Sequence, residues 1–258
     1  MRIEHEPYAE YHEQGKHFLR SHALIDFRKC PLLFRKKQLG LIPDEDKASY
    51  AVGRSAHKYI LEGEEAFNRE YVVGGPVNPK TGKSFGIDTQ KYAEWAALQS
   101  GTPIPESSFE LIVNMKTAIQ CHNRAAELIS SGEAESVFRV ELGGLPVQYR
   151  ADWINKTTLV DLKTCRDLDR FEWDAKDFGY LWQMAFGHAV LEIETGVEYD
   201  VEIIAVEKQE PYRVGVWKVH HDKLRLEKSE NMVAIEQLKR CRESDTWPTL
   251  YEEPRIFC

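Results

Sequence analysis

The spacing of hydrophobic residues divides the chain into a first half with helical periodicity and a second half where strands and helices alternate. Apolar residues recur three and four positions apart in several early segments. These predict helices over residues 21–39, 46–65, 89–99 and 106–131. Residues 72–90 are rich in glycine, proline and other turn formers, so they predict a long loop.

From Ser136 onwards the pattern favours strands. Alternating or continuous apolar runs predict strands over residues 136–142, 145–155, 158–164, 198–207 and 212–220. Gly143-Gly144 and Asn155-Lys156 are short turns, so we expect the first three strands to be consecutive antiparallel neighbours. Helices are predicted over 168–195, with a break near Gly179, and over 221–243. Together these elements predict an α+β fold in which helices flank a central mixed β-sheet, with a helical N-terminal part.

The chain is long enough to bury one large core, and we interpret residues 1–258 as a single domain. It divides into a polar arm (1–20), a mainly helical part (21–131), a part with the sheet and its helices (132–220) and a C-terminal helix and tail (221–258). The first twenty residues are polar and rich in irregularly spaced histidines, which is typical of a surface arm rather than of a metal site.

Charge and cysteine content narrow the possible classes of protein. The net charge of −8 argues against a protein that merely coats nucleic acid, because such binding depends on neutralising phosphates. The stretch from Arg20 to Lys37 carries six basic residues and one acid, and it is either a solvated helix face or a nucleic-acid contact. Five scattered cysteines, no secretory pattern and no long apolar run predict a reduced, cytoplasmic protein without a membrane partner.

Three charged residues fall on two neighbouring predicted strands. Asp152 lies on the first, and Asp161 and Lys163 lie two apart on the second, so the latter pair shares one face. Their apolar surroundings make these charges costly unless they are paired or bind metal. Hard divalent cations bind carboxylates and assist phosphodiester hydrolysis, where a lysine orients the attacking water. Taken alone, however, the pattern also fits an ordinary surface Asp–Lys pair.

Longer motifs resemble those of one nuclease superfamily. Arg150-Ala-Asp152-Trp-Ile and Leu159-Val-Asp161-Leu-Lys163-Thr resemble the R-x-D…(I/V)-(I/V)-D-x-K-T core of PD-(D/E)XK nucleases. Four other segments narrow the resemblance to the RecE-like exonucleases of phages and prophages. They are Ser21–Pro31 (S-x-x-L-x-x-F-x-x-C/S-P), Gly53–His57 (G-x-x-x-H), the loop Asn78–Thr89, and Tyr180-Leu-Trp-Gln183 (Y-x-x-Q). The set spans roughly residues 20 to 190 in the order of that family.

The resemblance implies roles for particular residues. It implies Mg²⁺, or Mn²⁺ as a substitute, bound by His57, Asp152, Asp161 and the backbone carbonyl of Leu162. Lys163 would position the nucleophilic water, and Gln183 would steady the site or touch the scissile phosphate with help from Tyr180. Without the family, a lone histidine such as His57 on an amphipathic helix is more often a core or surface residue.

Further residues are weaker candidates. Glu141 is either an additional acid on the preceding strand or simply a strand-end residue. Ser21 and Arg28 lie at a predicted helix start that would suit a DNA phosphate. Gly187 stands where many relatives have a tyrosine, which leaves the DNA contact made there in doubt. Another branch of the superfamily holds an iron–sulfur cluster through four cysteines, but the C-x-x-C spacing is missing here, so we expect no cluster.

The leading hypothesis is therefore a magnesium-dependent exodeoxyribonuclease acting on double-stranded DNA ends. The resemblance further implies 5′ to 3′ polarity, single strands made for recombination, a single-strand annealing protein as partner, a ring-shaped homo-oligomer, and a bacterial or phage-infected cell. A structure-selective endonuclease on the same core, a non-catalytic DNA-binding scaffold and an RNA-directed nuclease remain alternatives.

Overall fold

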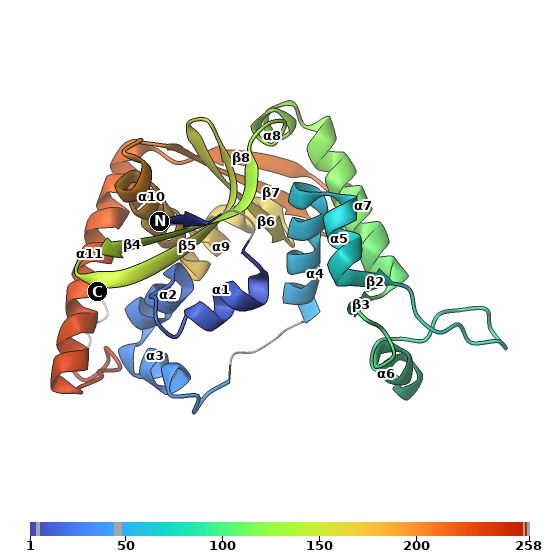
Figure 1. Cartoon of the computed structure of the whole chain (residues 1–258), viewed down its shortest axis with the longest axis horizontal. Helices are drawn as coiled ribbons and strands as arrows, with labels where there is room; N and C mark the ends of the chain where they lie inside the picture. The colour runs from blue at the N-terminus through green and yellow to red at the C-terminus, as the bar shows by residue number, and fades with distance from the viewer. Residues whose placement is uncertain (4–5, 44–47, 255, 257–258) are drawn as a thin grey trace.

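A mixed β-sheet forms the centre of the computed structural model, which describes residues 1–3, 6–43, 48–254 and 256 (Figure 1). Its strand order is β1-β4-β5-β6-β7-β8. The bounds are β1 (Arg2–Ile3), β4 (Glu133–Leu142), β5 (Leu145–Asn155), β6 (Thr158–Cys165), β7 (Asp200–Glu207) and β8 (Val214–Lys218). Strands β6 and β7 are parallel, and the other neighbours are antiparallel. A small parallel pair joins β2 (Tyr71–Val73) to β3 (Thr102–Ile104).

Helices cover both faces of this sheet. Those before the first long strand are α1 (Tyr8–Gln14), α2 (Ser21–Lys29), α3 (Pro31–Gln38), α4 (Ala48–His57), α5 (Glu64–Glu70), α6 (Gln90–Ala96), α7 (Glu106–Cys121) and α8 (Asn123–Leu128), with a π-helical turn η1 (Lys58–Glu62). Those after it are the 3₁₀ turn η2 (Leu168–Arg170), α9 (Phe171–Phe178), α10 (Tyr180–Thr195) and α11 (His221–Ser244). None of the helices described is both long and apolar enough to cross a bilayer. The predicted α+β class with a mixed sheet is confirmed.

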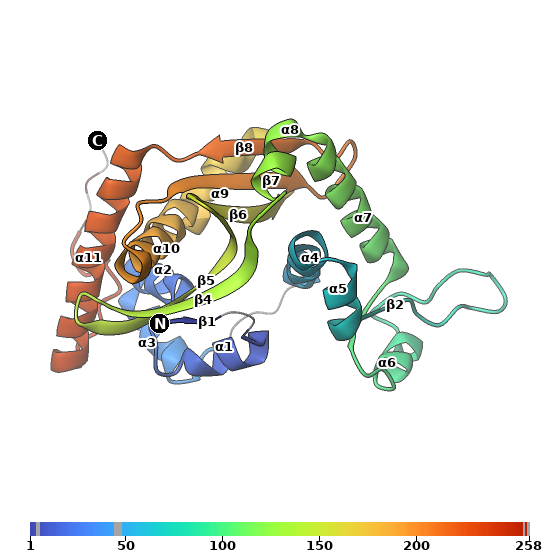
Figure 2. The ribbon, with the colours of Figure 1, turned by 45° about the horizontal axis from the view of Figure 1, so that its top comes forward.

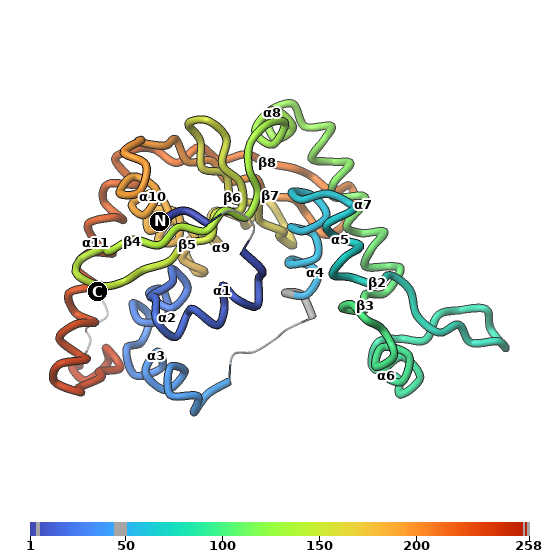
Figure 3. The backbone as a smooth tube through the Cα atoms, in the orientation of Figure 1, coloured from blue at the N-terminus to red at the C-terminus, as the bar shows by residue number. Residues whose placement is uncertain are grey.

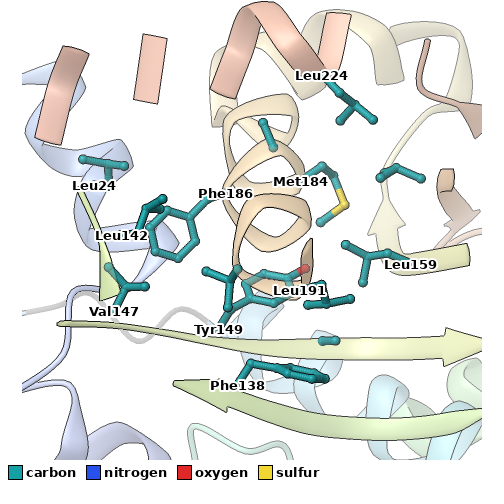
Figure 4. Close-up of a cluster of buried hydrophobic side chains, with 14 of the residues drawn as sticks. Leu24, Phe138, Leu142, Val147, Tyr149, Leu159, Met184, Phe186, Leu191 and Leu224 are labelled. Atoms are coloured by element: carbon teal, nitrogen blue, oxygen red, sulfur yellow. The ribbon is translucent and has the colours of Figure 1, made fainter. Parts of the chain in front are cut away.

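Helices lie on both sides of the sheet in Figure 2. The sheet separates two hydrophobic clusters. One lies between the sheet and helices α2, α10 and α11, and Figure 4 shows Tyr149 and Phe186 among its side chains. The other lies on the side of α4, α7 and α8. On β6, Leu159 belongs to the first cluster and Val160 to the second. Because side chains alternate along a strand, Asp161 and Lys163 face α10.

The crossover from β6 to β7 runs through α9 and α10. Gly179 lies between these helices in the left-handed conformation (φ 75°, ψ 33°), which turns the chain sharply without the steric cost that a Cβ would bring. The predicted break near Gly179 is confirmed. A parallel strand pair needs such a long connection, whereas the β4–β5 and β5–β6 pairs need only short turns.

Several predicted helices are interrupted. The helix predicted over 21–39 breaks at Cys30, which is extended because Pro31 disfavours helical backbone in the residue before it. The helix predicted over 46–65 begins outside the described residues at Asp46, leaves α geometry after His57 and ends at Gly63. The helix predicted over 106–131 stops at Cys121, and His122 caps a separate α8.

Residues 1–20, which the sequence predicts as a polar surface arm, contact the sheet at several points. Strand β1 pairs with β4, and the buried carboxylate of Glu6 accepts hydrogen bonds of 2.7 and 2.8 Å from Arg139. Tyr11 and Leu19 are also buried. The polar residues of this segment therefore find partners on the sheet. Figure 3 shows the segment beside the β4–β5 hairpin, and it shows the loop between β2 and α6 extending away from the body.

Candidate active site

Strands β5 and β6 stop pairing where the two aspartates lie. Their last matched residues before this point are Trp153 and Val160, so the next pair would be Asp152 opposite Asp161. There, Asp152 Oδ2 accepts a hydrogen bond of 2.9 Å from the backbone N–H of Leu162. A side-chain carboxylate thus takes the place of a backbone acceptor. The hydrogen bond fixes Asp152 against β6 at the point where the strands separate.

Asp161, Lys163 and Gln183 form a buried hydrogen-bonded group. The Lys163 ammonium lies 2.8 Å from Asp161 Oδ2 and donates to Gln183 Oε1 at 3.1 Å. The Gln183 amide donates to Asp161 Oδ1 at 3.3 Å. Asp161 is 1% exposed, and burial raises the pKa of its carboxyl to about 6 although the Lys163 charge opposes the rise. Burial would lower the pKa of Lys163, but the charges of Asp161 and Asp152 outweigh it and raise that pKa, so Lys163 remains protonated.

Helix α10 explains the Y-x-x-Q spacing. Tyr180 occupies its first turn and Gln183 lies three residues later, on the same face of the helix. The ring centre of Tyr180 is 4.8 Å from Lys163 Nζ, which is a cation–π distance. One face of α10 therefore holds the lysine through both an aromatic ring and an amide oxygen.

A second group of side chains meets at the other side of Asp152. His57 is the last residue of α4, and its Nδ1 lies 3.5 Å from Asp152 Oδ2. Glu135 joins them, and one ligand atom from each of the three residues lies within 4.8 Å of the others. Asp161 is not part of this trio. Asp161 is linked to the trio by the next residue along β6, because the backbone N–H of Leu162 donates to Asp152.

Glu135 was not among the residues expected from the sequence. The pairs on either side of it, Ala134 with Trp153 and Ser136 with Ala151, place Glu135 opposite Asp152 in the β4–β5 hairpin. The two residues lie equally far from the Gly143-Gly144 turn, so a register count from that turn would have found the position. The backbone of Glu135 has φ 57°, an uncommon value for a residue with a side chain.

Glu135 forms an ion pair with Arg150. Burial raises the pKa of Glu135 to about 7, against the lowering effect of Arg150, and the Asp152 charge raises it further. Arg150 is the arginine of the R-x-D motif. Its position beside Glu135 gives that motif residue a physical role, since it offsets part of the negative charge gathered around Asp152.

The donor atoms present fit a hard divalent cation. The trio offers two carboxylates, which suit Mg²⁺ or Mn²⁺, and an imidazole, which adds a nitrogen donor. Buried Asp161 Oδ2 has only its ion pair with Lys163 and no well-directed hydrogen bond from any of the described residues. An acceptor that is buried but incompletely satisfied is costly unless a cation completes it.

The weaker candidates lie apart from this site. Glu141 is exposed near the β4–β5 turn, opposite Pro146, and the structure does not bring it to the other acids. The Arg28 guanidinium donates to Asn231 Oδ1 at 2.8 Å and lies 3.9 Å from the Trp182 ring centre. Arg28 thereby joins α2 to α10 and α11.

Two other expectations remain predictions. Ser21 is buried at the first position of α2, and a phosphate contact there stays a prediction. Leu162 meets Asp152 through its N–H, and its carbonyl as a metal ligand likewise stays a prediction.

The aromatic ring of Tyr149 explains why position 187 is a glycine. A Cβ at Gly187 would lie 2.2 Å from Tyr149 Cζ, far inside contact distance. Tyr149 is 2% exposed, and burial raises the pKa of its phenol well above the usual range, with Asp161 and Asp152 adding to the rise. The space beside α10 is thus filled from β5 (Figure 4).

Comparisons with known proteins bear on the family and the fold of the chain. A family model described as "PDDEXK-like domain of unknown function (DUF3799)" matches residues 21–256. No curated protein matches the chain. A crystal structure from Eubacterium rectale, described as a "Putative exonuclease", is similar with a TM-score of 0.73 and 17% sequence identity. The match covers 99% of this chain and 96% of the other. At that identity the similarity shows a shared fold.

Proposed function

The chain belongs to the PDDEXK-like domain family, and on that premise we propose that it is a magnesium-dependent exodeoxyribonuclease acting on double-stranded DNA ends. The observation that supports this most directly is the buried Asp161–Lys163–Gln183 group beside the trio His57, Glu135 and Asp152. A nuclease fold needs such a combination of cation ligands and a fixed ammonium. A scaffold would have no use for these charges, which are costly to bury.

The residues would act in distinct ways during hydrolysis. A bound Mg²⁺ would polarise the phosphate and favour ionisation of water. Lys163 keeps its proton because of its carboxylate neighbours, so it supplies positive charge to the attacking water or the phosphate. Gln183 and Tyr180 restrict the ammonium to one position, which reduces the reorganisation required as charge develops.

Action from a DNA end is the finer part of the proposal. It is supported by the RecE-like motifs and by the name of the similar Eubacterium rectale protein, both of which are analogies. The 5′ to 3′ polarity, the recombination role, an annealing-protein partner and a ring-shaped homo-oligomer follow from the same resemblance. A structure-selective endonuclease would use the same residues and differ in its need for an end.

The test compares linear, nicked-circular and closed-circular duplexes incubated with Mg²⁺. We expect linear DNA to be degraded, with the label at the 5′ end released first and the closed circle intact. Asp161→Asn and Lys163→Met should abolish this activity. Glu141→Gln is the matched control, because Glu141 is an exposed acid at the far end of β4 and its replacement should leave the rate unchanged.

Other outcomes would contradict the proposal in separate ways. Cleavage of closed circles would favour the endonuclease. Activity that survives Asp161→Asn would refute the site assignment. If calorimetry detects Mg²⁺ or Mn²⁺ binding that is lost in Asp152→Ala but no DNA is cut, the chain binds metal without being this nuclease.

A further inference from the structure

A row of aromatic rings leads outward from Lys163 to solvent. The Tyr180 ring lies 4.8 Å from the ammonium and the Phe178 ring lies 5.8 Å from that of Tyr180, at an interplanar angle of 37°. Buried Phe171 also contacts Tyr180, with ring centres 5.9 Å apart. Phe178 itself is 56% exposed. The last ring in the row therefore offers a large apolar surface two ring contacts away from the catalytic lysine.

The position of Phe178 is fixed by its backbone. It is the last residue of α9, and the left-handed Gly179 that follows is tightly enclosed, since a Cβ there would lie 2.8 Å from Trp182. The ammonium of Lys29 donates a hydrogen bond of 2.6 Å to the carbonyl of Asp177, which holds the end of α9 against α2. An exposed phenylalanine by itself is ordinary. This one sits on a constrained turn within two ring contacts of the reacting group.

We propose that Phe178, together with Tyr180, forms a stacking platform for an unpaired base of the nucleotide that flanks the phosphodiester held at Lys163. This inference rests on the proposed nuclease function and specifies its substrate at the site as a single-stranded or frayed segment. Bases stack on aromatic rings with little dependence on sequence, because every base has a π-face.

The charge of the chain makes such a contact useful. With a net charge of −8, the protein can neutralise DNA phosphates only where basic residues gather locally. Stacking adds affinity without basic residues and acts at the nucleotide next to the metal ligands. A paired base is already stacked in the duplex, so the platform selects for a strand that has left its partner.

The experiment measures binding of a fluorescent single-stranded oligonucleotide with Mg²⁺ in an Asp161→Asn background, which separates binding from hydrolysis. Phe178→Ala should weaken binding about 5- to 150-fold, which corresponds to the loss of one stacked base. Phe178→Trp should retain affinity, whereas Phe178→Leu, which is apolar but lacks a ring, should not. Trp173→Ala is the matched control, because Trp173 is 68% exposed on the same helix and its ring contacts Lys176.

An abasic scan identifies the stacked base. Removing one base at a time from the oligonucleotide should weaken binding to the Asp161→Asn protein at one or two positions. Abasic sites at those positions should not weaken binding further when Phe178→Ala is also present. Thermal melting checks that all variants are folded. Equal loss in Phe178→Ala and Trp173→Ala, or abasic effects that persist without Phe178, would overturn the platform.

Different results would refute the stacking platform and the proposed nuclease function. If the wild type degrades linear DNA and Phe178→Ala binds and cuts as well as wild type, the platform is refuted and the nuclease stands. If binding depends on Phe178 but no nucleic acid is cut, the platform stands and the nuclease is refuted. If the wild type neither binds nor cuts, both are refuted.

Discussion

Replacing Gly187 by alanine tests how closely β5 and α10 are fitted together beside the site. The added Cβ would lie 2.2, 2.5 and 2.6 Å from Cζ, Cε1 and Cε2 of Tyr149. Carbon atoms rest about 3.5–4.0 Å apart, so the ring or the helix must move by more than about 1 Å. Overfilling a core in this way costs about 1–3 kcal/mol or more.

A second effect opposes the clash. Alanine stabilises a helix interior by up to about 1 kcal/mol relative to glycine. With Tyr149 fully enclosed, we expect the clash to dominate and the variant to lose about 2 kcal/mol. For a chain of this size that loss lowers the melting temperature by about 4–8 °C. Since Gln183 lies one turn before Gly187 on α10, the displaced helix should also reduce the rate of DNA cleavage.

Calorimetric and urea unfolding measure the change in stability. Gly53→Ala is the matched control. Gly53 is also within a helix, but among the described residues outside that helix a Cβ there would meet Thr164 Oγ1 alone, at 3.8 Å. It should be neutral or stabilising. Tyr149→Leu, which removes the clashing atoms, should make Gly187→Ala less costly than it is in the wild type. A Gly187→Ala protein as stable as wild type would refute the packing argument.

Three further predictions concern charge. Lys163→Met removes the cation 2.8 Å from Asp161 and should lower the catalytic rate constant by at least about 10²–10³-fold while circular dichroism shows a folded protein. Burial raises the pKa of Glu135 to about 7, so its carboxyl is protonated below that pH. The affinity for Mn²⁺, measured by calorimetry, should therefore rise between pH 6 and 8, and this rise should be smaller in Glu135→Gln. Arg28→Ala should destabilise the fold by about 1–3 kcal/mol through its bond to Asn231. The salt dependence of DNA binding should be unchanged in that variant, and a slope smaller by about one would instead indicate a phosphate contact.

The elements that carry Asp152, Asp161, Lys163 and Gln183 could be predicted from sequence because their signals are local. Alternation defined β5 and β6, a short turn made them neighbours, and Gly179 marked the break between α9 and α10. The Asp–Lys spacing then placed both charges on one face. These inferences depend on residues that lie close together along the chain.

Other features depend on pairing between residues that the motifs do not contain. Glu135 reaches the site because of strand register, which a count from the Gly143-Gly144 turn gives, and its backbone angle is uncommon. The N-terminal residues looked like a surface arm because Arg139, the partner of buried Glu6, lies far along the chain. The extended conformation of Cys30 was foreseeable from Pro31, whereas the change to π-helical geometry after His57 had no clear sequence signal.

The separation of β5 from β6 has a thermodynamic consequence. His57 comes from the helix whose Ala56 belongs to one hydrophobic cluster, whereas Asp161 faces the other. A cation bound by both His57 and Asp152 would link α4 to the sheet. The link would lie where β5 and β6 no longer pair through backbone hydrogen bonds. Such an ion adds to the folding free energy in proportion to the logarithm of its concentration. Chelation would then loosen the N-terminal helices and shorten the lifetime of the protein against proteases, before any substrate is present.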